Sequence, residues 1–311
     1  MPAASNHRSA RASRRTTHLA RALLEPRLGA HMSVAGGLHH AFDHARAVGC
    51  QCLQVFVKNQ RQWRARPYRP EEVAAWHAAA AGCEVRPVIA HATYLINLAS
   101  PDEGNWRRSI DAFADELERC EQLGIAALVV HPGAHLGAGE AAGCRRVAEG
   151  LRHALDRLGP ANVRPCIELT AGQGTCLGHR FEHVRDILDA LAGEPRVGVC
   201  FDTCHVLAAG FRFDTDETYA ATFAALDAAF GRERLLCFHL NDSVGACGSR
   251  VDRHAHIGAG HVGRGAFRRI VRDPRWRDLP MILETPKGVD QRGRDHDRLN
   301  LARLRRMIAA G

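Results

Sequence analysis

A carboxylate and an imidazole follow directly after one strongly apolar stretch near the middle of the chain. Residues 197–201 read Val-Gly-Val-Cys-Phe, and Asp202 and His205 come after them. A short continuous apolar run predicts a strand that is buried on both faces, as in a parallel sheet. Charged side chains are rarely buried without a partner, and aspartate and histidine are both zinc ligands. The stretch predicts either part of a metal site or one capped turn with an isolated histidine.

The same arrangement, an apolar run that ends at an imidazole or a carboxylate, recurs along the chain. The residues in this position are His31, His91, His131, Glu168, Asp202, His239 and Glu284. One such residue is usually a hydrogen-bonded group at the edge of the core, but a repeated pattern indicates a shared site. The set contains no cysteine, so it suits zinc or manganese better than a thiolate site. It also exceeds what one tetrahedral ion needs, so we expect more than one metal.

A second group of candidate ligands lies in the segment Asp252-Arg253-His254. Residues two apart in an extended segment face the same side, so Asp252 and His254 could bind one ion. Together with His205 they would form a three-ligand site with open positions, which is typical of catalytic zinc. His256 shares this alternation and is either a competing ligand or a solvated loop residue. His135 is expected to support the ligands rather than to bind metal.

The elements that must position these residues alternate regularly from residue 27 onward. Apolar runs that predict strands lie at 28–32, 52–57, 86–90, 125–130, 163–167, 197–201, 235–238 and 280–283. Segments with helical spacing lie at 38–48, 71–81, 110–120, 141–157, 181–191, 216–229, 264–272 and 297–309. This alternation predicts an α/β fold, a single-domain (β/α)8 TIM barrel, in which the carboxyl ends of all strands meet on one face. An open doubly wound sheet is the alternative, but no glycine-rich phosphate motif follows the first strand.

The positive charge of the chain is concentrated at its N-terminal end. The 311 residues carry a formal charge of +8, and residues 1–27, with six arginines and one acid, account for +5 of it. We predict that residues 1–26 form a disordered tail rich in Arg, Ala and Ser, and that residues 27–311 form the catalytic domain. The remaining charge is too close to neutral to indicate a nucleic-acid partner by itself.

The number of cysteines and the hydropathy of the chain indicate where in the cell the protein is expected. The 11 cysteines are odd in number and scattered over predicted strands and helices, so a reducing, cytoplasmic location is expected. No apolar run approaches the roughly 18 residues that a membrane span needs, so no membrane partner is expected.

Several motifs, spread over most of the chain, resemble those of the endonuclease IV family. The three signature matches are HATYLINL at 91–98, GVCFDTCH at 198–205, and HLND at 239–242 followed by DRH at 252–254. Shorter matches are KNQRQWRA at 58–65, HPGAH at 131–135, TAGQG at 170–174 and ILET at 282–285. The resemblance runs in order from about residue 27 to the C-terminus. It is far more specific than any single motif.

The resemblance implies three zinc ions per chain and assigns their ligands. The first zinc would be bound by His91, His131 and Glu168, the second by Glu168, Asp202, His239 and Glu284, and the third by His205, Asp252 and His254. In this scheme Glu168 bridges two ions and is also the catalytic residue. His31 falls outside the set, and we interpret it as a residue that lines the pocket.

The resemblance also implies contacts with DNA. Arg61, Tyr94 and Leu95 match positions that enter the duplex at the lesion. Without the resemblance, ordinary packing just past a strand would be the preferred interpretation of Tyr94 and Leu95. Two positions depart from the family pattern: Val244 replaces a usual lysine, and Leu169 replaces a small polar residue.

The function implied is that of a DNA-repair apurinic/apyrimidinic endonuclease. Such a hydrolase cleaves the phosphodiester bond 5′ to an abasic site in double-stranded DNA with a trinuclear zinc centre, and leaves a 3′-hydroxyl and a 5′-deoxyribose phosphate. It also trims blocked 3′ ends, and we expect it to act as a monomer.

Two other functions compete with this one. A metal-dependent sugar isomerase or epimerase of the same barrel class would use Glu168, Asp202, His239 and Glu284 with one or two metals, but it would not need the additional histidines. A DNA-damage binder with structural metals is disfavoured by the open coordination positions.

Overall fold

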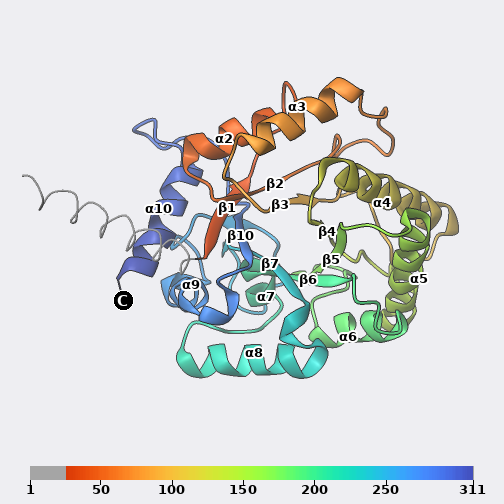
Figure 1. The fold of residues 1–311 in the computed structure, drawn as a ribbon. Helices are drawn as coiled ribbons and strands as arrows, with labels where there is room; N and C mark the ends of the chain where they lie inside the picture. Colours follow the sequence, from red (N-terminus) through yellow and green to blue (C-terminus); the bar gives the residue numbers. More distant parts are fainter. Residues whose placement is uncertain (1–25, 311) are drawn as a thin grey trace, which may run out of the picture.

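Eight parallel strands form a closed barrel at the centre of the molecule (Figure 1). The structure is a computed structural model that describes residues 26–310. The barrel strands are β1 (Arg27–His31), β2 (Cys52–Val55), β3 (Val88–His91), β4 (Ala127–Val130), β5 (Arg164–Glu168), β6 (Gly198–Asp202), β7 (Leu235–His239) and β10 (Pro280–Leu283). Their order around the barrel is β1-β10-β7-β6-β5-β4-β3-β2, and every neighbouring pair is parallel. The predicted (β/α)8 TIM barrel is therefore confirmed.

Helices surround the barrel and connect successive strands (Figure 1). The helices near the expected positions are α2 (His40–Val48), α3 (Pro70–Ala81), α4 (Glu103–Leu123), α5 (Glu140–Leu158), α6 (Phe181–Ala190), α8 (Asp216–Phe230), α9 (Gly263–Arg272) and α10 (His296–Ala309). Short elements supplement them: α7 (Thr203–Ala208), the 3-10 helices η1 (Arg232–Arg234) and η2 (Pro274–Trp276), and the strands β8 (Asp242–Ser243) and β9 (His254–Ala255). The predicted tail over residues 1–26 lies, except for Pro26, outside the described residues. Between residues 26 and 310, no helix has the length and apolar character needed to cross a bilayer.

Helix α4 begins at Glu103, ahead of the periodic stretch at 110–120 that predicts it. Asp102 caps the helix, because its side chain accepts a hydrogen bond from the backbone N–H of Asn105 (2.7 Å). The Trp106 indole packs into the core and donates to the carbonyl oxygen of Leu98 (3.0 Å). The helix start is thus set by a cap and by tertiary packing rather than by apolar spacing.

A layer of small and medium side chains fills the barrel below its carboxyl end. Side chains alternate along a strand, so residues two places before the strand-end groups also point inward. The layer consists of Cys52, Ile89, Ala127, Val129, Cys166, Cys200, Cys237 and Ile282, all buried. Burial raises the pKa of the Cys200 thiol well above its usual value, so this cysteine stays protonated and packs as a small apolar group. Gly29 is needed beside this layer, because a Cβ there would lie 2.0 Å from the carbonyl oxygen of Cys52.

The outer faces of β6 and β7 pack against an aromatic cluster. The ring of Phe201 on β6 lies 5.2 Å from that of Phe223 on α8 and 5.4 Å from that of Phe238 on β7. The ring of Trp276 in η2 lies 5.6 Å from that of Phe238. These contacts fix the two strands that end at Asp202 and His239.

Replacing Phe238 by Ala should lower the free energy of unfolding by about 3–5 kcal/mol, because it leaves a cavity in this cluster. Denaturant titration measures the change. The control is Val289→Ala, at a side chain that is 60% exposed, which should shift stability by less than about 0.5 kcal/mol. Equal stability of the two variants would contradict the packing described here.

Candidate metal centre

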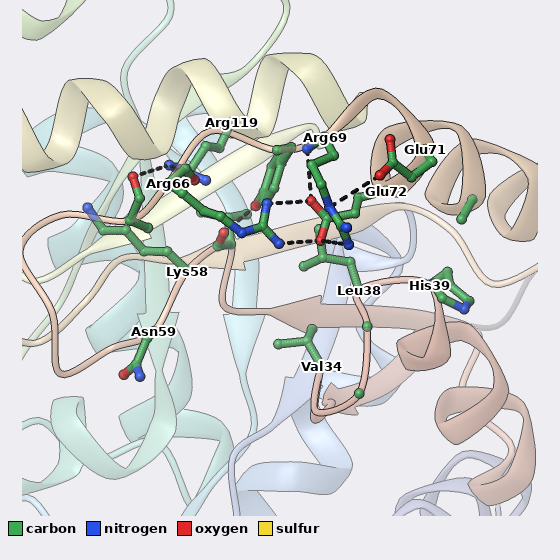
Figure 2. Close-up of a pocket in the computed structure, with 16 residues that line it drawn as sticks. Val34, Leu38, His39, Lys58, Asn59, Arg66, Arg69, Glu71, Glu72 and Arg119 are labelled. Atoms are coloured by element: carbon green, nitrogen blue, oxygen red, sulfur yellow. Dashed lines mark hydrogen bonds and ion pairs between the residues drawn. The ribbon is translucent and has the colours of Figure 1, made fainter.

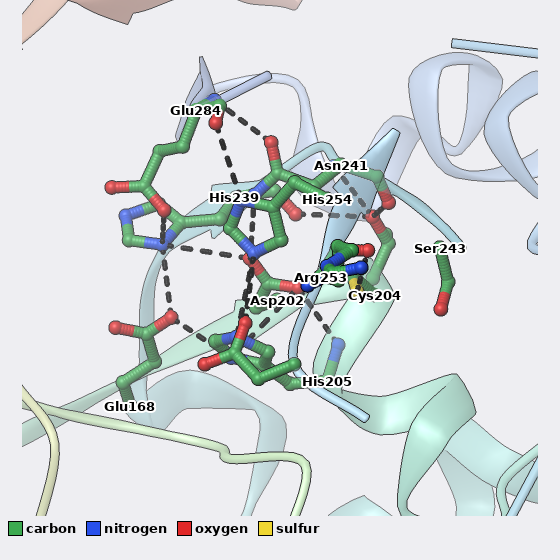
Figure 3. A network of polar contacts seen from close by, with 12 residues as sticks. Glu168, Asp202, Cys204, His205, His239, Asn241, Ser243, Arg253, His254 and Glu284 are labelled. Atoms are coloured by element: carbon green, nitrogen blue, oxygen red, sulfur yellow. Dashed lines mark hydrogen bonds and ion pairs between the residues drawn. The ribbon is translucent and has the colours of Figure 1, made fainter. Parts of the chain in front are cut away.

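The structure brings all nine predicted ligands together at the carboxyl end of the barrel. Six of them end or directly follow barrel strands, one lies on α7, and two lie on or beside β9. A cavity of about 340 Å³ opens onto this group, and its lining includes His91, His131, His205, His254 and Glu284. Figure 3 shows side chains from β5, β6, β7 and the end of β10 converging on this point.

Glu168 lies at the centre of the group and is completely buried. Its Oε2 atom is 3.0 Å from Nε2 of His91 and 3.1 Å from Nε2 of His131. Its Oε1 atom is 3.1 Å from Nδ1 of His239 and 3.1 Å from Nδ1 of His205. The two oxygens therefore face different sets of imidazoles, as expected of a carboxylate that bridges two ions.

The imidazoles around Glu168 keep this carboxylate ionised. Burial alone would raise the pKa of Glu168, but the attraction of His131 and His239 and the hydrogen bonds of His131 and His205 outweigh it. The pKa of Glu168 consequently lies well below its usual value.

Backbone and side-chain acceptors fix the tautomers of His91 and His239. Nδ1 of His91 donates to the carbonyl oxygen of Ala92 (2.7 Å), so the lone pair of Nε2 faces Glu168. Nε2 of His239 donates to Oε1 of Gln54 (2.8 Å), so the lone pair of Nδ1 faces Glu168. The repulsion between such a lone pair and a carboxylate oxygen is removed by a cation between them. That cation is either a metal ion or a proton, since the attraction of neighbouring carboxylates outweighs burial and raises the pKa of His91 and of His239. Hydrogen bonds of this kind also orient metal-binding histidines.

In the second group, formed by His205, Asp252 and His254, hydrogen bonds to backbone carbonyl oxygens again fix the orientation of the imidazole rings. Nδ1 of His205 donates to the carbonyl oxygen of Leu169 (3.0 Å), and Nδ1 of His254 donates to that of Glu284 (3.2 Å). The two Nε2 atoms then face each other at 3.4 Å. Oδ1 of Asp252 lies 3.1 Å and 3.6 Å from these two nitrogens. Two imidazole lone pairs and a carboxylate oxygen directed at one point are a donor set for a divalent metal.

Helix α7 explains how Asp202 and His205 reach the same site. Asp202 is the N-cap of α7, and its Oδ1 accepts a hydrogen bond from the backbone N–H of His205 (2.9 Å). The sequence predicted either a capped turn or part of a metal site at Asp202 and His205. In the structure these two residues form the capped turn and also belong to the group of predicted ligands. The cap fixes the first turn of the helix and so directs His205 toward Asp252.

A two-stranded sheet positions Asp252 and His254. Strands β8 and β9 pair antiparallel, with Ser243 opposite His254, and the N–H of Val244 donates to the carbonyl oxygen of Arg253 (3.0 Å). The sequence did not predict this sheet, because two-residue strands give no apolar pattern.

Three further histidines have other roles. Nδ1 of His31 lies 3.8 Å from Oε1 of Glu284, so His31 adjoins a predicted ligand, but it is not among the residues that line the cavity. Nδ1 of His135 accepts a hydrogen bond from Gly139 (3.1 Å) and thus closes its own loop instead of supporting a ligand. The His256 ring stacks on His296 at 4.3 Å, so it does not compete with the predicted ligands.

Sequence reasoning missed Gln54 and Asn241, which are both completely buried. Besides accepting from His239, Gln54 donates through its amide nitrogen to Oε1 of Glu284 (2.6 Å). Asn241 donates to Oδ2 of Asp202 (2.6 Å) and accepts from the backbone N–H of Glu284 (2.8 Å). For Gln54 the available signal was a lone amide side chain inside the otherwise apolar predicted strand at 52–57, whereas Asn241 lies beyond the predicted strand at 235–238 and gave no such signal.

Another group of ligand-type residues, Glu140, His179 and His183, lies away from the cavity lining. Nδ1 of His183 accepts a hydrogen bond from the N–H of Gly178 (3.3 Å), so its proton is on Nε2, 3.1 Å from Oε2 of Glu140. Nδ1 of His179 donates to the carbonyl oxygen of Cys176 (2.8 Å). A protonated Nε2 cannot bind metal. We therefore interpret this group as a set of polar contacts that attaches the start of α6, and the loop before it, to the start of α5.

Of the three residues predicted to contact DNA, Tyr94 is among those that line the cavity. Its side chain is 65% exposed, which differs from a tyrosine packed past a strand. Leu95 is half-buried, and Arg61 is exposed on the loop after β2.

Comparisons with known proteins agree on one family. A family model described as xylose isomerase-like TIM barrel matches residues 42–306. The chain is 52% identical over 283 residues to a probable endonuclease 4 of Chloroflexus aggregans, covering 91% of this chain and 98% of that protein. It is 46% identical over 281 residues to a probable endonuclease 4 of Geobacter sulfurreducens, covering 90% and 94% of the two chains.

Solved structures include a member of the same family and more distant proteins with the same fold. The crystal structure of endonuclease IV from Thermus thermophilus superposes with a TM-score of 0.80 at 38% identity, covering 92% of this chain and 100% of that one. A D-tagatose 3-epimerase-like protein superposes with a TM-score of 0.69 at 15% identity, covering 91% and 98%, which shows the shared fold alone.

Replacing Gln54 by Leu should lower zinc affinity about 10- to 100-fold, because His239 loses the acceptor that sets its tautomer and Glu284 loses a donor. Competition with a chromophoric chelator measures the affinity. The matched control is Gln51→Leu, just before the other end of β2, where the side chain accepts only from the N–H of Leu28. Unchanged affinity in Gln54→Leu would show that Gln54 does not orient the ligands.

Proposed function

The chain belongs to the endonuclease IV family, and from this premise we propose that it cleaves the phosphodiester bond 5′ to abasic sites in duplex DNA. The products would be a 3′-hydroxyl and a 5′-deoxyribose phosphate, and blocked 3′ ends would be trimmed by the same site. We propose residues 27–311 as the catalytic domain, acting as a monomer in the cytoplasm.

The observation that best supports this proposal is the facing pair of Nε2 atoms on His205 and His254, 3.4 Å apart. Both Nδ1 atoms are engaged by carbonyl oxygens, so both Nε2 atoms are directed at one point, where a metal ion could bind to them and to Oδ1 of Asp252. The protein thus has a donor set beyond the one centred on Glu168. This second set supports a centre with more than two metal ions.

We propose that three zinc ions occupy the centre. The first would be held by His91, His131 and Glu168, the second by Glu168, Asp202, His239 and Glu284, and the third by His205, Asp252 and His254. The donor chemistry fits, since imidazoles and carboxylates with open positions are typical of catalytic zinc. When bound, such ions lower the pKa of water and neutralise charge on a phosphate.

The chain's own residues would orient the reactants. Glu168 is ionised and buried, so its oxygens can accept a hydrogen bond and align the attacking water with the phosphorus. Gln54 and Asn241 keep Glu284 and Asp202 in place through hydrogen bonds of 2.6 Å. Arg253 is among the residues that line the same cavity.

Tyr94, Leu95 and Arg61 would recognise the lesion. Tyr94 stands at the rim with its ring 5.9 Å from that of Phe56 and 5.5 Å from that of His91. An exposed aromatic ring beside the cavity can stack on a base next to the gap that an abasic sugar leaves.

A sugar epimerase remains the competing function because of the shared barrel. The site argues against it, since His205, Asp252 and His254 provide ligands beyond the set that one or two metals would need.

The decisive experiment is a nicking assay on a duplex with one abasic site, combined with elemental analysis of the same preparation. We expect cleavage on the 5′ side, a 3′ end that a polymerase can extend, and about three zinc ions per chain. A single ion per chain with no nicking, together with turnover of a ketose sugar, would establish the epimerase.

Glu168→Gln should reduce nicking by several orders of magnitude, because the amide keeps the shape but loses the charge that two ions would share. Single-turnover cleavage measures the effect, and DNA binding should be largely retained. Glu149→Gln, an exposed residue on α5, is the control and should cleave normally. Near-normal cleavage by Glu168→Gln would place this residue outside the reaction.

Tyr94→Ala and Leu95→Ala should each weaken the preference for abasic over intact DNA, by about 1–3 kcal/mol for each lost stacking contact. Binding titrations with both duplexes measure this preference. Tyr94→Phe keeps the ring and should keep the preference. A large fall in melting temperature with unchanged preference would instead indicate that these side chains serve packing.

A further inference from the structure

We propose that Glu116 on α4 is a positioning residue that sets the two DNA-recognition segments relative to each other. These segments are residues 58–66, which contain Arg61, and residues 93–98, which contain Tyr94 and Leu95. The inference rests on the proposed function.

Glu116 first binds the beginning of residues 58–66. Its Oε1 atom lies 3.3 Å from Nζ of Lys58, and both side chains are completely buried. Nζ of Lys58 also donates to Oδ2 of Asp115 (3.2 Å) and to the carbonyl oxygen of Trp63 (3.3 Å). Lys58 therefore closes the turn that presents Arg61 and fixes this turn to α4.

The same carboxylate also binds the beginning of residues 93–98. The backbone N–H of Thr93 lies 3.2 Å from Oε2 and 3.4 Å from Oε1 of Glu116. Thr93 directly precedes Tyr94, so this hydrogen bond fixes the backbone from which the exposed ring projects. One buried carboxylate thus contacts both segments.

Arg119, one turn further along α4, holds the other end of residues 58–66. Its Nη2 atom donates to the carbonyl oxygens of Ala65 (3.2 Å) and Arg66 (2.9 Å), and its guanidinium stacks over the Tyr68 ring at 4.8 Å. Figure 2 shows Arg119 beside Arg66 at this end of the segment. Both ends of the segment are therefore attached to α4.

A buried ion pair is poor evidence for stability, because the cost of desolvating two charges offsets their attraction. An apolar pair of similar volume would fill the same space at least as well. What an apolar pair cannot do is accept the N–H of Thr93 and donate to the carbonyl oxygen of Trp63. The charges at this position are therefore best explained by the geometry that they impose on the two segments.

The test replaces both charges, because removing Glu116 alone would leave the buried Lys58 with Asp115 as its one remaining carboxylate partner. In Lys58→Met/Glu116→Leu, we expect unchanged zinc content and an unchanged single-turnover rate at saturating enzyme. The preference for abasic over intact DNA should fall about tenfold. Arg157→Met/Glu118→Leu, which removes an exposed 2.9 Å ion pair between α5 and the same helix α4, should have no effect.

Combination with Tyr94→Ala distinguishes positioning from general loosening. If Glu116 acts through Tyr94, the double substitution should cost less than twofold in preference when Tyr94 is already absent, because coupled sites are not additive. The same tenfold loss in both backgrounds would overturn the proposal.

Amide hydrogen exchange gives a readout that does not depend on activity. Peptides covering residues 58–66 and 93–98 should exchange faster in Lys58→Met/Glu116→Leu, and peptides from the barrel strands should not. If wild-type protein fails to nick abasic DNA while this exchange pattern holds, the proposed function fails and the structural coupling stands. Unchanged exchange in both segments would refute the coupling itself.

Discussion

The site depends on one buried carboxylate, Glu168, that is held ionised among imidazoles. A charge without solvent is tolerated only where its partners are close, and His91, His131, His205 and His239 all lie within 3.1 Å of its oxygens. Those imidazoles come from different elements, so the barrel must close with the correct register before Glu168 is satisfied. The register of β5 against β6, with Glu168 opposite Cys200, and of β6 against β7, with Asp202 opposite His239, meets this requirement.

The orientation of these imidazole rings is set by hydrogen bonds from the ring nitrogen that faces away from the site to groups that are not themselves ligand candidates. Carbonyl oxygens of Ala92 and Leu169 hold His91 and His205, and the amide of Gln54 holds His239. Because Leu169 acts through its backbone, its side chain can differ from the small polar residue usual in the family without loss of this hydrogen bond. The departure at Leu169 therefore leaves the orientation of His205 intact.

Much of the fold and the gathering of the site could be predicted from the sequence, because both follow from alternation. Apolar runs predict the strands, and in a parallel barrel every carboxyl end faces the same way, so strand-end groups such as His91 and Glu168 must meet. Elements without periodicity could not be predicted in this way. The β8–β9 sheet and the hydrogen bonds of Gln54 depend on contacts between residues distant in sequence, and the start of α4 at Glu103 depends on the local cap at Asp102.

The origins of the predicted ligands divide the centre into two structural parts. His91, His131, Glu168, Asp202, His239 and Glu284 belong to the barrel strands or directly follow them, whereas His205 lies on α7, and Asp252 and His254 lie beside or on the short strand β9. The barrel alone therefore supplies only the set centred on Glu168. The additional donor set requires a capped turn at Asp202 and a two-stranded sheet, both of which are local additions at the carboxyl end. Proteins with the same barrel, such as the D-tagatose 3-epimerase-like protein at 15% identity, can therefore share the strand framework while their function depends on the loops and short elements beyond the strand ends.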